Sequence, residues 1–286
     1  MERTLLIYPD MPGLEPERGF HDINGPSLIR VPDWIENPLG RYYLYFAHHN
    51  GSYIRMAYAD DLSGPYTIYR PGVLHLENTI FRSHIASPDV HIDDENQRLI
   101  MYFHGPYPEG GQQTAMSEST DGLNFTAHNI RLGTSYFRVF KWNNMFYASA
   151  FSKIYRSQDR NKPFELRKTD LFPWKVRHTA ILLKDDDIWI FQSRYGDAPE
   201  HIMVSTFKLT PDWNEWTPSE PVTVLKPERD FEGVNEPIEP SVGGLSRGPV
   251  HQLRDPAIYE EGDKVYLLYS VAGEYGIAIT RLEEIG

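Results

Sequence analysis

Short hydrophobic runs separated by polar turns recur along the chain. Each unit begins with one hydrophobic run, passes through a polar or charged turn, and continues into a second run. Runs of about four to eight residues rich in aromatic and β-branched residues are typical of β-strands, so each unit predicts a β-hairpin. Five copies lie at residues 25–47, 87–103, 138–148, 178–191 and 255–269, the first with an insertion at 32–40.

A third and usually a fourth strand-like run follow each hairpin. Ser63-Gly64 and Asp121-Gly122 separate two pairs of these runs and are typical hairpin turns. The last copy has only three runs, and residues 4–8 have the length and composition of the missing strand. We therefore predict an all-β fold in which residues 1–286 form one five-bladed β-propeller, with the N-terminal strand completing the last blade. A β-sandwich would not require five similar hairpins.

Composition narrows the class of protein. Hydrophobic residues make up 40% of the chain, and the net charge of −12 argues against nucleic acid or an anionic membrane as partner. The absence of cysteine excludes disulfides and thiolate chemistry. No run is long enough for a membrane span or a signal peptide, so we expect a cytoplasmic protein, or a periplasmic or secreted one already trimmed. The oligomeric state is left open.

Polar and ionisable residues gather at one end of the predicted propeller. The start of the innermost strand and the end of the second strand lie on the same face of a blade, because these strands are antiparallel. Converging ionisable groups predict a binding or catalytic site. They are Asn24, His84, Asp89, Arg138, Arg177, His178, Arg254 and Asp255 at strand starts, and His49, His104, Arg194 and Glu274 at or just after strand ends.

Two segments carry a resemblance to a known group of enzymes. Residues 87–90 (SPDV) and 254–270 (RDPAIYEEGDKVYLLYS) resemble blade openings of the five-bladed propeller glycoside hydrolases of families 43, 32, 68 and 117. The resemblance implies hydrolysis of an oligosaccharide by acidic groups at the channel mouth. It also implies that Asp89 matches an aspartate that tunes its neighbours and holds the sugar. Asp255 matches an Asp-Pro opening, although in the last blade rather than the first.

The catalytic positions depart from the family 43 pattern. Asn24 stands where that family usually places its basic aspartate, and no residue clearly matches the usual glutamic acid. Family 117 uses a histidine as the acid, and His178 fits that part by resemblance. Glycoside cleavage needs a proton donor and a base or nucleophile. The candidates for donor are His178, Glu232 and Glu274, and those for base are Asp255 first and then Asp89.

Four arginines suggest an anionic substrate. Arg138, Arg177, Arg194 and Arg254 could pair with the carboxylate or sulfate of a uronate-containing or sulfated sugar from a plant or algal polysaccharide. The alternative is that each arginine neutralises a nearby aspartate. We expect Asn24, His49, His84 and His104 to bind substrate as well. No metal-ligand spacing is present and no cofactor is required, although the resemblance leaves room for a calcium ion on the axis.

Several activities remain open at this point. Longer loops at 9–24, 104–112, 195–201 and 226–254 could wall a pocket, which favours exo-action, and the resemblance favours inversion. A polysaccharide lyase would use His178, Tyr136, Arg138 and Arg177 to neutralise a uronate and remove a proton. A sugar-binding propeller without catalysis is a third reading, and a phosphorylase a further one.

Overall fold

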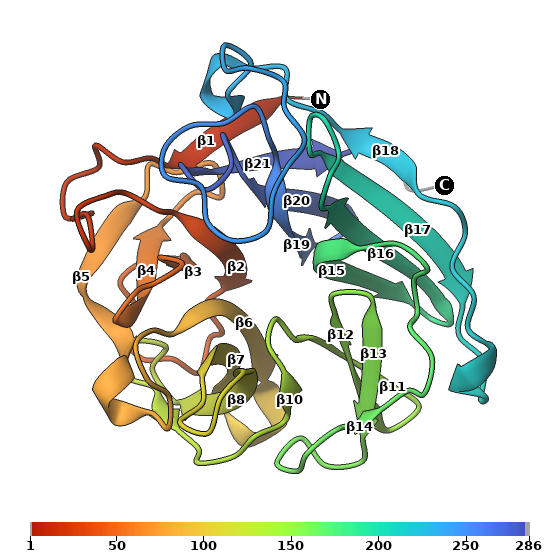
Figure 1. The fold of residues 1–286 in the computed structure, drawn as a ribbon. Coiled ribbons are helices and arrows are strands. Elements are labelled where there is room, and N and C mark those ends of the chain that lie inside the picture. The colour runs from red at the N-terminus through yellow and green to blue at the C-terminus, as the bar shows by residue number, and fades with distance from the viewer. Residues whose placement is uncertain (1, 284–286) are drawn as a thin grey trace.

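The computed structural model describes residues 2–283, which form five antiparallel sheets around a central axis (Figure 1). The predicted five-bladed β-propeller is therefore confirmed. From the centre outward, blade one consists of β2 (Asn24–Arg30), β3 (Tyr42–Ala47), β4 (Tyr53–Ala59) and β5 (Thr67–His75), and blade two of β6 (Ala86–Asp93), β7 (Arg98–Pro106) and β8 (Gln112–Ser119), with β9 (Thr126–Ala127) and β10 (Gly133–Thr134) at the outer position. Blade three consists of β11 (Arg138–Trp142), β12 (Met145–Ala150), β13 (Lys153–Ser157) and β14 (Glu165–Leu166), and blade four of β15 (Val176–Lys184), β16 (Asp187–Arg194), β17 (Ile202–Lys208) and β18 (Val222–Leu225). Blade five consists of β19 (Arg254–Glu261), β20 (Lys264–Ser270), β21 (Ile277–Leu282) and β1 (Arg3–Ile7).

The N-terminal strand completes the fifth blade, as the sequence predicts. β1 pairs with β21 in antiparallel register, with Arg3 opposite Thr280 and Leu5 opposite Ala278. In Figure 1 the red β1 accordingly lies beside the dark blue strands of the last blade. The ring is thus closed by hydrogen bonds between strands from the two ends of the chain.

Each pair of neighbouring blades encloses its own hydrophobic core. The five clusters of buried residues correspond to the five interfaces of the ring, with no cluster confined to one blade. Tyr45 and Phe103 pack between blades one and two, for example, and Leu44 and Leu268 between blades one and five. Because side chains alternate across a strand, each sheet is hydrophobic on both faces and supplies two of these cores.

A β-bulge shapes the start of the innermost strand in four blades. The pairing register shifts at the beginning of β2, β6, β15 and β19. In three of them a residue with positive φ precedes a proline: Gly25 (60°), Ser87 (51°) and Asp255 (46°). A Cβ on Gly25 would lie 3.0 Å from the Ser87 Cα, so glycine suits that position. Bulges redirect side chains, and here they set which residues reach the polar face.

Helical structure in residues 2–283 is limited to short 3-10 turns. None of them is long or hydrophobic enough to cross a membrane. They are η1 (Leu76–Asn78), η2 (Asp94–Asn96), η3 (Trp213–Glu215) and η4 (Asp230–Glu232), the last within the long connection between β18 and β19.

Candidate active site

A pocket of about 290 Å³ opens on the face where the innermost strands begin. Its volume is close to the lower end of the range for small-molecule sites, about 300–1,000 Å³. Three of the four long loops predicted to wall a pocket contribute to it. The lining residues are His49, Gln112, Thr134, Ser135, Tyr136, Phe151, Arg177, His178, Tyr195 and Gly244.

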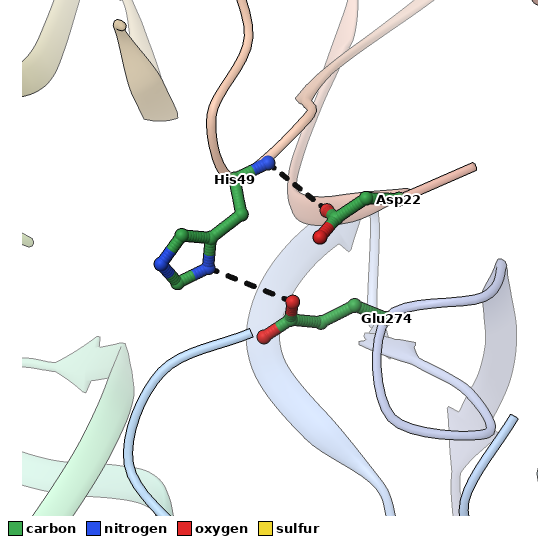
Figure 2. Close-up of side chains that lie close together, drawn as sticks. All are labelled: Asp22, His49 and Glu274. Atoms are coloured by element: carbon green, nitrogen blue, oxygen red, sulfur yellow. Dashed lines mark hydrogen bonds and ion pairs between the residues drawn. The ribbon is translucent and has the colours of Figure 1, made fainter. Parts of the chain in front are cut away.

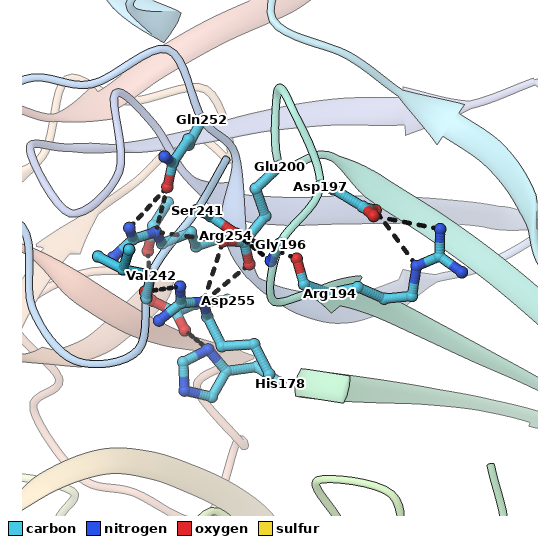
Figure 3. Close-up of polar contacts among 12 residues, drawn as sticks. His178, Arg194, Gly196, Asp197, Glu200, Ser241, Val242, Gln252, Arg254 and Asp255 are labelled. Atoms are coloured by element: carbon cyan, nitrogen blue, oxygen red, sulfur yellow. Dashed lines mark hydrogen bonds and ion pairs between the residues drawn. The ribbon is translucent and has the colours of Figure 1, made fainter. Parts of the chain in front are cut away.

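His178 and Asp255 form a buried pair at this pocket (Figure 3). The His178 Nδ1 atom contacts the Asp255 carboxylate, whose second oxygen accepts a hydrogen bond of 3.0 Å from the Ser270 hydroxyl. Burial would raise the pKa of Asp255, but the charge and hydrogen bond of His178 outweigh burial and hold this pKa well below its ordinary value. The buried Nε2 atom of His178 has no hydrogen-bond partner in the described residues, so it can meet a ligand.

Tyr136 packs between two histidine rings. Its ring centroid lies 4.1 Å from that of His104 and 4.5 Å from that of His178. Burial raises the pKa of the Tyr136 hydroxyl, and the charges of Glu274 and Asp255 raise it further. Burial lowers the pKa of His104 well below its ordinary value, so the stack presents a neutral phenol and a neutral imidazole.

Asp22, His49 and Glu274 form a second group, here called the carboxylate cluster (Figure 2). The Ile23 amide donates to the Glu274 carbonyl at 2.7 Å, and Ile23 and Tyr275 form a parallel bridge, which joins the start of blade one to the last turn of blade five. The His49 amide donates to the Asp22 carboxylate at 3.0 Å, and its Nδ1 lies 3.5 Å from the Glu274 carboxylate.

The two carboxyl groups of this cluster have very different pKa values. Burial and the nearby charge of Glu274 raise the pKa of Asp22 to about 10. Burial also opposes ionisation of Glu274, but hydrogen bonding and charge from His49, together with Arg254, lower its pKa to about 2. Arg254 Nη1 lies 3.0 Å from Glu274 Oε1. At neutral pH, Asp22 therefore carries a proton and Glu274 is ionised.

Arg177 and Arg254 attach the long loop between β18 and β19 to the site, and Figure 3 shows Arg254 beside Val242 of that loop. Arg177 pairs with the buried Glu200 at 2.8 Å and donates to the carbonyl of Val242, while both arginines donate to the carbonyl of Gly244. The guanidinium of Arg177 also lies over the Tyr195 ring, 4.2 Å from its centroid. These interactions fix the loop segment that forms one wall of the pocket.

The other two arginines are engaged as well. Arg138 donates to the carbonyls of Ser87 and Pro88 on blade two. Arg194 forms two contacts of 3.2 Å with Asp197, and this is the internal neutralisation that the sequence left open as an alternative. The guanidinium groups predicted to bind an anionic sugar thus all contact protein groups.

The comparisons with known proteins agree with this architecture. No family model matches the chain. An uncharacterized protein of Acanthamoeba polyphaga mimivirus is 34% identical over 297 aligned residues, covering 91% of this chain and 83% of that protein. This chain belongs to the same family as that viral protein.

The solved structures that are similar to this chain include family-43 glycoside hydrolases. A thermostable family-43 enzyme has a TM-score of 0.61 at 15% identity, covering 93% of this chain and 91% of its own. A family-43 enzyme from Xanthomonas citri complexed with xylotriose has a TM-score of 0.64 at 12% identity, and the match covers 99% of this chain and 92% of that enzyme. A glycosyl hydrolase from Bacteroides ovatus has a TM-score of 0.67 at 11% identity, and the match covers 93% of this chain and 85% of that protein. The resemblance predicted from the sequence is therefore confirmed at the level of the fold.

Asp89 does not join the pocket in this family member. It lies two residues beyond the position equivalent to Asp255, which Ser87 occupies in blade two. Its carboxylate accepts hydrogen bonds from the Val139 amide at 2.8 Å and from His91 Nε2 at 2.9 Å. It lines a separate cavity of about 150 Å³ between the innermost strands. Asp89 thus joins blades two and three, as a capping aspartate would.

Glu232 is also placed away from the pocket. It forms an ion pair of 2.6 Å with Arg3 and accepts a hydrogen bond of 2.8 Å from the Tyr269 hydroxyl. Its carboxylate also accepts from the amides of Glu228 and Arg229. The structure therefore gives this fully buried residue a structural role, holding η4 against the N-terminal strand.

The remaining predicted residues surround the carboxylate cluster without lining the pocket. Asn24 is buried and donates to Asp22 at 2.6 Å. His84 is buried with its pKa lowered to about 4, chiefly by burial, and its Nδ1 lies 3.2 Å from the Ser83 hydroxyl.

Asp22 is the site residue that the sequence argument missed. Alignment of blades on their X-Pro openings placed Asn24 at the start of blade one and drew attention away from the residue two positions earlier. The signal available was the His21-Asp22 pair just before a predicted strand. Only the bridge to Tyr275 shows that this aspartate meets Glu274.

Proposed function

We propose that this protein is a glycoside hydrolase that releases the terminal sugar of an oligosaccharide. The observation that carries the proposal is one pocket, on a family-43-type propeller, lined both by an aspartate-bound imidazole and by the histidine of a buried carboxylate cluster. Cleavage of a glycosidic bond needs a proton donor for the leaving oxygen and a group that activates water. His178 and the carboxylate cluster are the two groups available for these roles.

His178 is the proton donor in this proposal, and Asp255 is its positioning residue. An aspartate at Nδ1 orients the imidazole, stabilises its protonated form and leaves Nε2 to donate to the leaving oxygen. His49, the cluster member that lines the pocket, receives the proton of the attacking water at Nε2, and Glu274 at its Nδ1 stabilises the imidazolium that forms. Because water then attacks opposite the leaving group, the reaction inverts the anomeric centre.

The pocket favours a neutral sugar at a chain end. Arg177, which lines the pocket, is held by Glu200 and a main-chain carbonyl, and Arg194 is held by Asp197, which reduces support for the anionic substrate predicted from them. Solved structures with this fold include enzymes complexed with xylose or xylotriose and an exo-1,5-alpha-L-arabinanase, which supports a neutral pentose. A volume of about 290 Å³, with Tyr136 and Phe151 as apolar surface, suits one sugar ring and exo-action.

The lyase alternative has weaker support. In the predicted lyase set of His178, Tyr136, Arg138 and Arg177, Tyr136 does not suit the part of base, because the pKa of its hydroxyl is raised by burial and by two nearby carboxylates. A phenol in this state donates a proton rather than accepting one.

The test is product analysis on a panel of neutral and uronate-bearing oligosaccharides. We expect wild-type protein to release monosaccharide, with proton NMR showing inversion, and His178→Ala and Asp255→Asn to lower kcat by about 10²–10⁴-fold, as loss of general acid catalysis does. His128→Ala is the matched control, because His128 lies outside the pocket. Unsaturated uronate products would indicate a lyase, and full activity of His178→Ala would overturn the assignment.

A further inference from the structure

We propose that Asp22, His49 and Glu274 form a binding site for a divalent transition-metal ion at the pocket wall. One ligand atom from each residue lies within 4.8 Å of the others. The three come from the segment before β2, the segment after β3 and the turn between β20 and β21, and a main-chain hydrogen bond from Ile23 to Glu274 holds the first and last together.

Unpaired buried oxygens point to a missing partner. Among the described residues, Asp22 Oδ2 has no hydrogen-bond partner and Glu274 Oε2 has only the His49 Nδ1 atom at 3.5 Å, although Asp22 is fully buried and Glu274 is only 2% exposed. Buried carboxylate oxygens are normally hydrogen-bonded, ion-paired or coordinated to a metal. The other oxygen of each group is already used, by Asn24 and the His49 amide for Asp22 and by Arg254 for Glu274.

The charge around the cluster favours a dication. The buried carboxylates at this mouth belong to Asp22, Glu274, Asp255 and Glu200, whereas the guanidinium groups paired with them are those of Arg177 and Arg254. With all four carboxylates ionised, two negative charges remain, and His178 and His49 lie against Asp255 and Glu274. A divalent ion bound to His49 Nδ1 would supply positive charge directly beside Asp22 and Glu274.

The ligand types indicate which ion. One imidazole and two carboxylates suit Zn²⁺ or Mn²⁺, whereas Ca²⁺ prefers about six to eight oxygen ligands. Ligand bonds of about 2.0–2.2 Å would place the donor atoms about 3.4 Å apart, so small side-chain rotations would close the site. This site differs from an axial calcium site, because none of its three residues lines the cavity between the innermost strands.

His49 connects this site to the pocket. It is the cluster member that lines the pocket, so an ion bound to its Nδ1 would fix the ring orientation there. A bound dication also lowers the pKa of coordinated water, which is the task assigned above to the cluster. That consequence rests on the proposed function, whereas binding of the ion does not.

Electron paramagnetic resonance with Mn²⁺ added to metal-free protein tests the site. We expect one Mn²⁺ per chain, with the free-ion signal lost and imidazole nitrogen coupling present. Asp22→Asn should weaken binding about tenfold or more, and His49→Gln should remove the nitrogen coupling. Asp89→Asn is the matched control, because Asp89 is another channel aspartate beside a histidine and should leave binding unchanged.

The outcomes separate the two proposals. A free-ion spectrum for the wild-type protein, with Zn²⁺ also failing to bind by calorimetry, overturns the metal site whatever the variants do. Wild-type affinity in both Asp22→Asn and His49→Gln also overturns it. Thermal unfolding without metal checks that each variant is folded. Mn²⁺ binding without hydrolysis of any oligosaccharide would leave the site standing and refute the proposed activity.

Discussion

Asp89 illustrates at the residue scale how a carboxylate can join two blades. Burial opposes its ionisation, but His91, Arg138 and the Val139 amide outweigh burial and hold its pKa below the ordinary value. A carboxyl whose pKa is lower in the folded protein stabilises it above the pKa of the unfolded chain, about 3.9 for aspartate. That stabilisation is lost as the pH falls through the lower, folded-state value.

We therefore expect Asp89→Asn to destabilise the protein more at neutral than at acid pH. At pH 7 the free energy of unfolding should fall by about 1–3 kcal/mol, because a charge-assisted buried interaction is lost. Near pH 3 the difference from wild type should shrink. Urea unfolding of both proteins at the two pH values measures this, and an equal difference at both would contradict it.

At the residue scale, position at a strand opening was the signal that the sequence offered for individual site residues. His178 and Asp255 were singled out by their place at strand openings, and the structure pairs them. Asp22 was not, because its role depends on a bridge to Tyr275 formed only when the ring closes. Asp89 and Asp255 both adjoin a proline, but Asp255 lies within the β-bulge of its strand, whereas Asp89 follows the bulge and pairs with Tyr102.

At the scale of elements, hairpins were predictable and the long loop was not. A two-residue turn at Asn143 and Asn144, both with positive φ, is encoded locally by residues that tolerate that conformation. The course of the loop between β18 and β19 depends instead on distant partners. Glu232 looked like a proton donor in an acidic loop, yet it is paired with Arg3 from the other end of the chain.

We expect Glu232→Gln to reduce stability without the specific catalytic loss of His178→Ala. Removing one partner of a buried ion pair costs about 3–5 kcal/mol, and the lower end applies because Arg3 also pairs with Glu228. Chemical denaturation should show this loss, and Arg3→Met combined with Glu232→Gln should cost less than the sum of the single changes. A native unfolding curve with abolished activity would instead indicate a catalytic Glu232.

At the scale of the whole molecule, the repeats encode the fold, whereas the site depends on closing the ring. Each hairpin repeat can be recognised alone, and five interblade cores follow from strands that are hydrophobic on both faces. The pocket, by contrast, combines side chains from different blades, and Asp22 and Glu274 come from nearly opposite ends of the chain. No local pattern specifies that juxtaposition.

Ring closure by β1 can be tested directly. Deleting residues 1–8 removes the hydrogen-bonded partner of β21 and the buried Leu6 and Ile7, each worth about 1.5–3 kcal/mol. We expect a single unfolding transition at lower temperature, because the fifth blade supplies two interblade cores. A peptide of residues 1–8 added in excess should raise the transition with its concentration, whereas a scrambled peptide should not. An unchanged transition after deletion would mean that β1 covers the edge of β21 without holding the ring together.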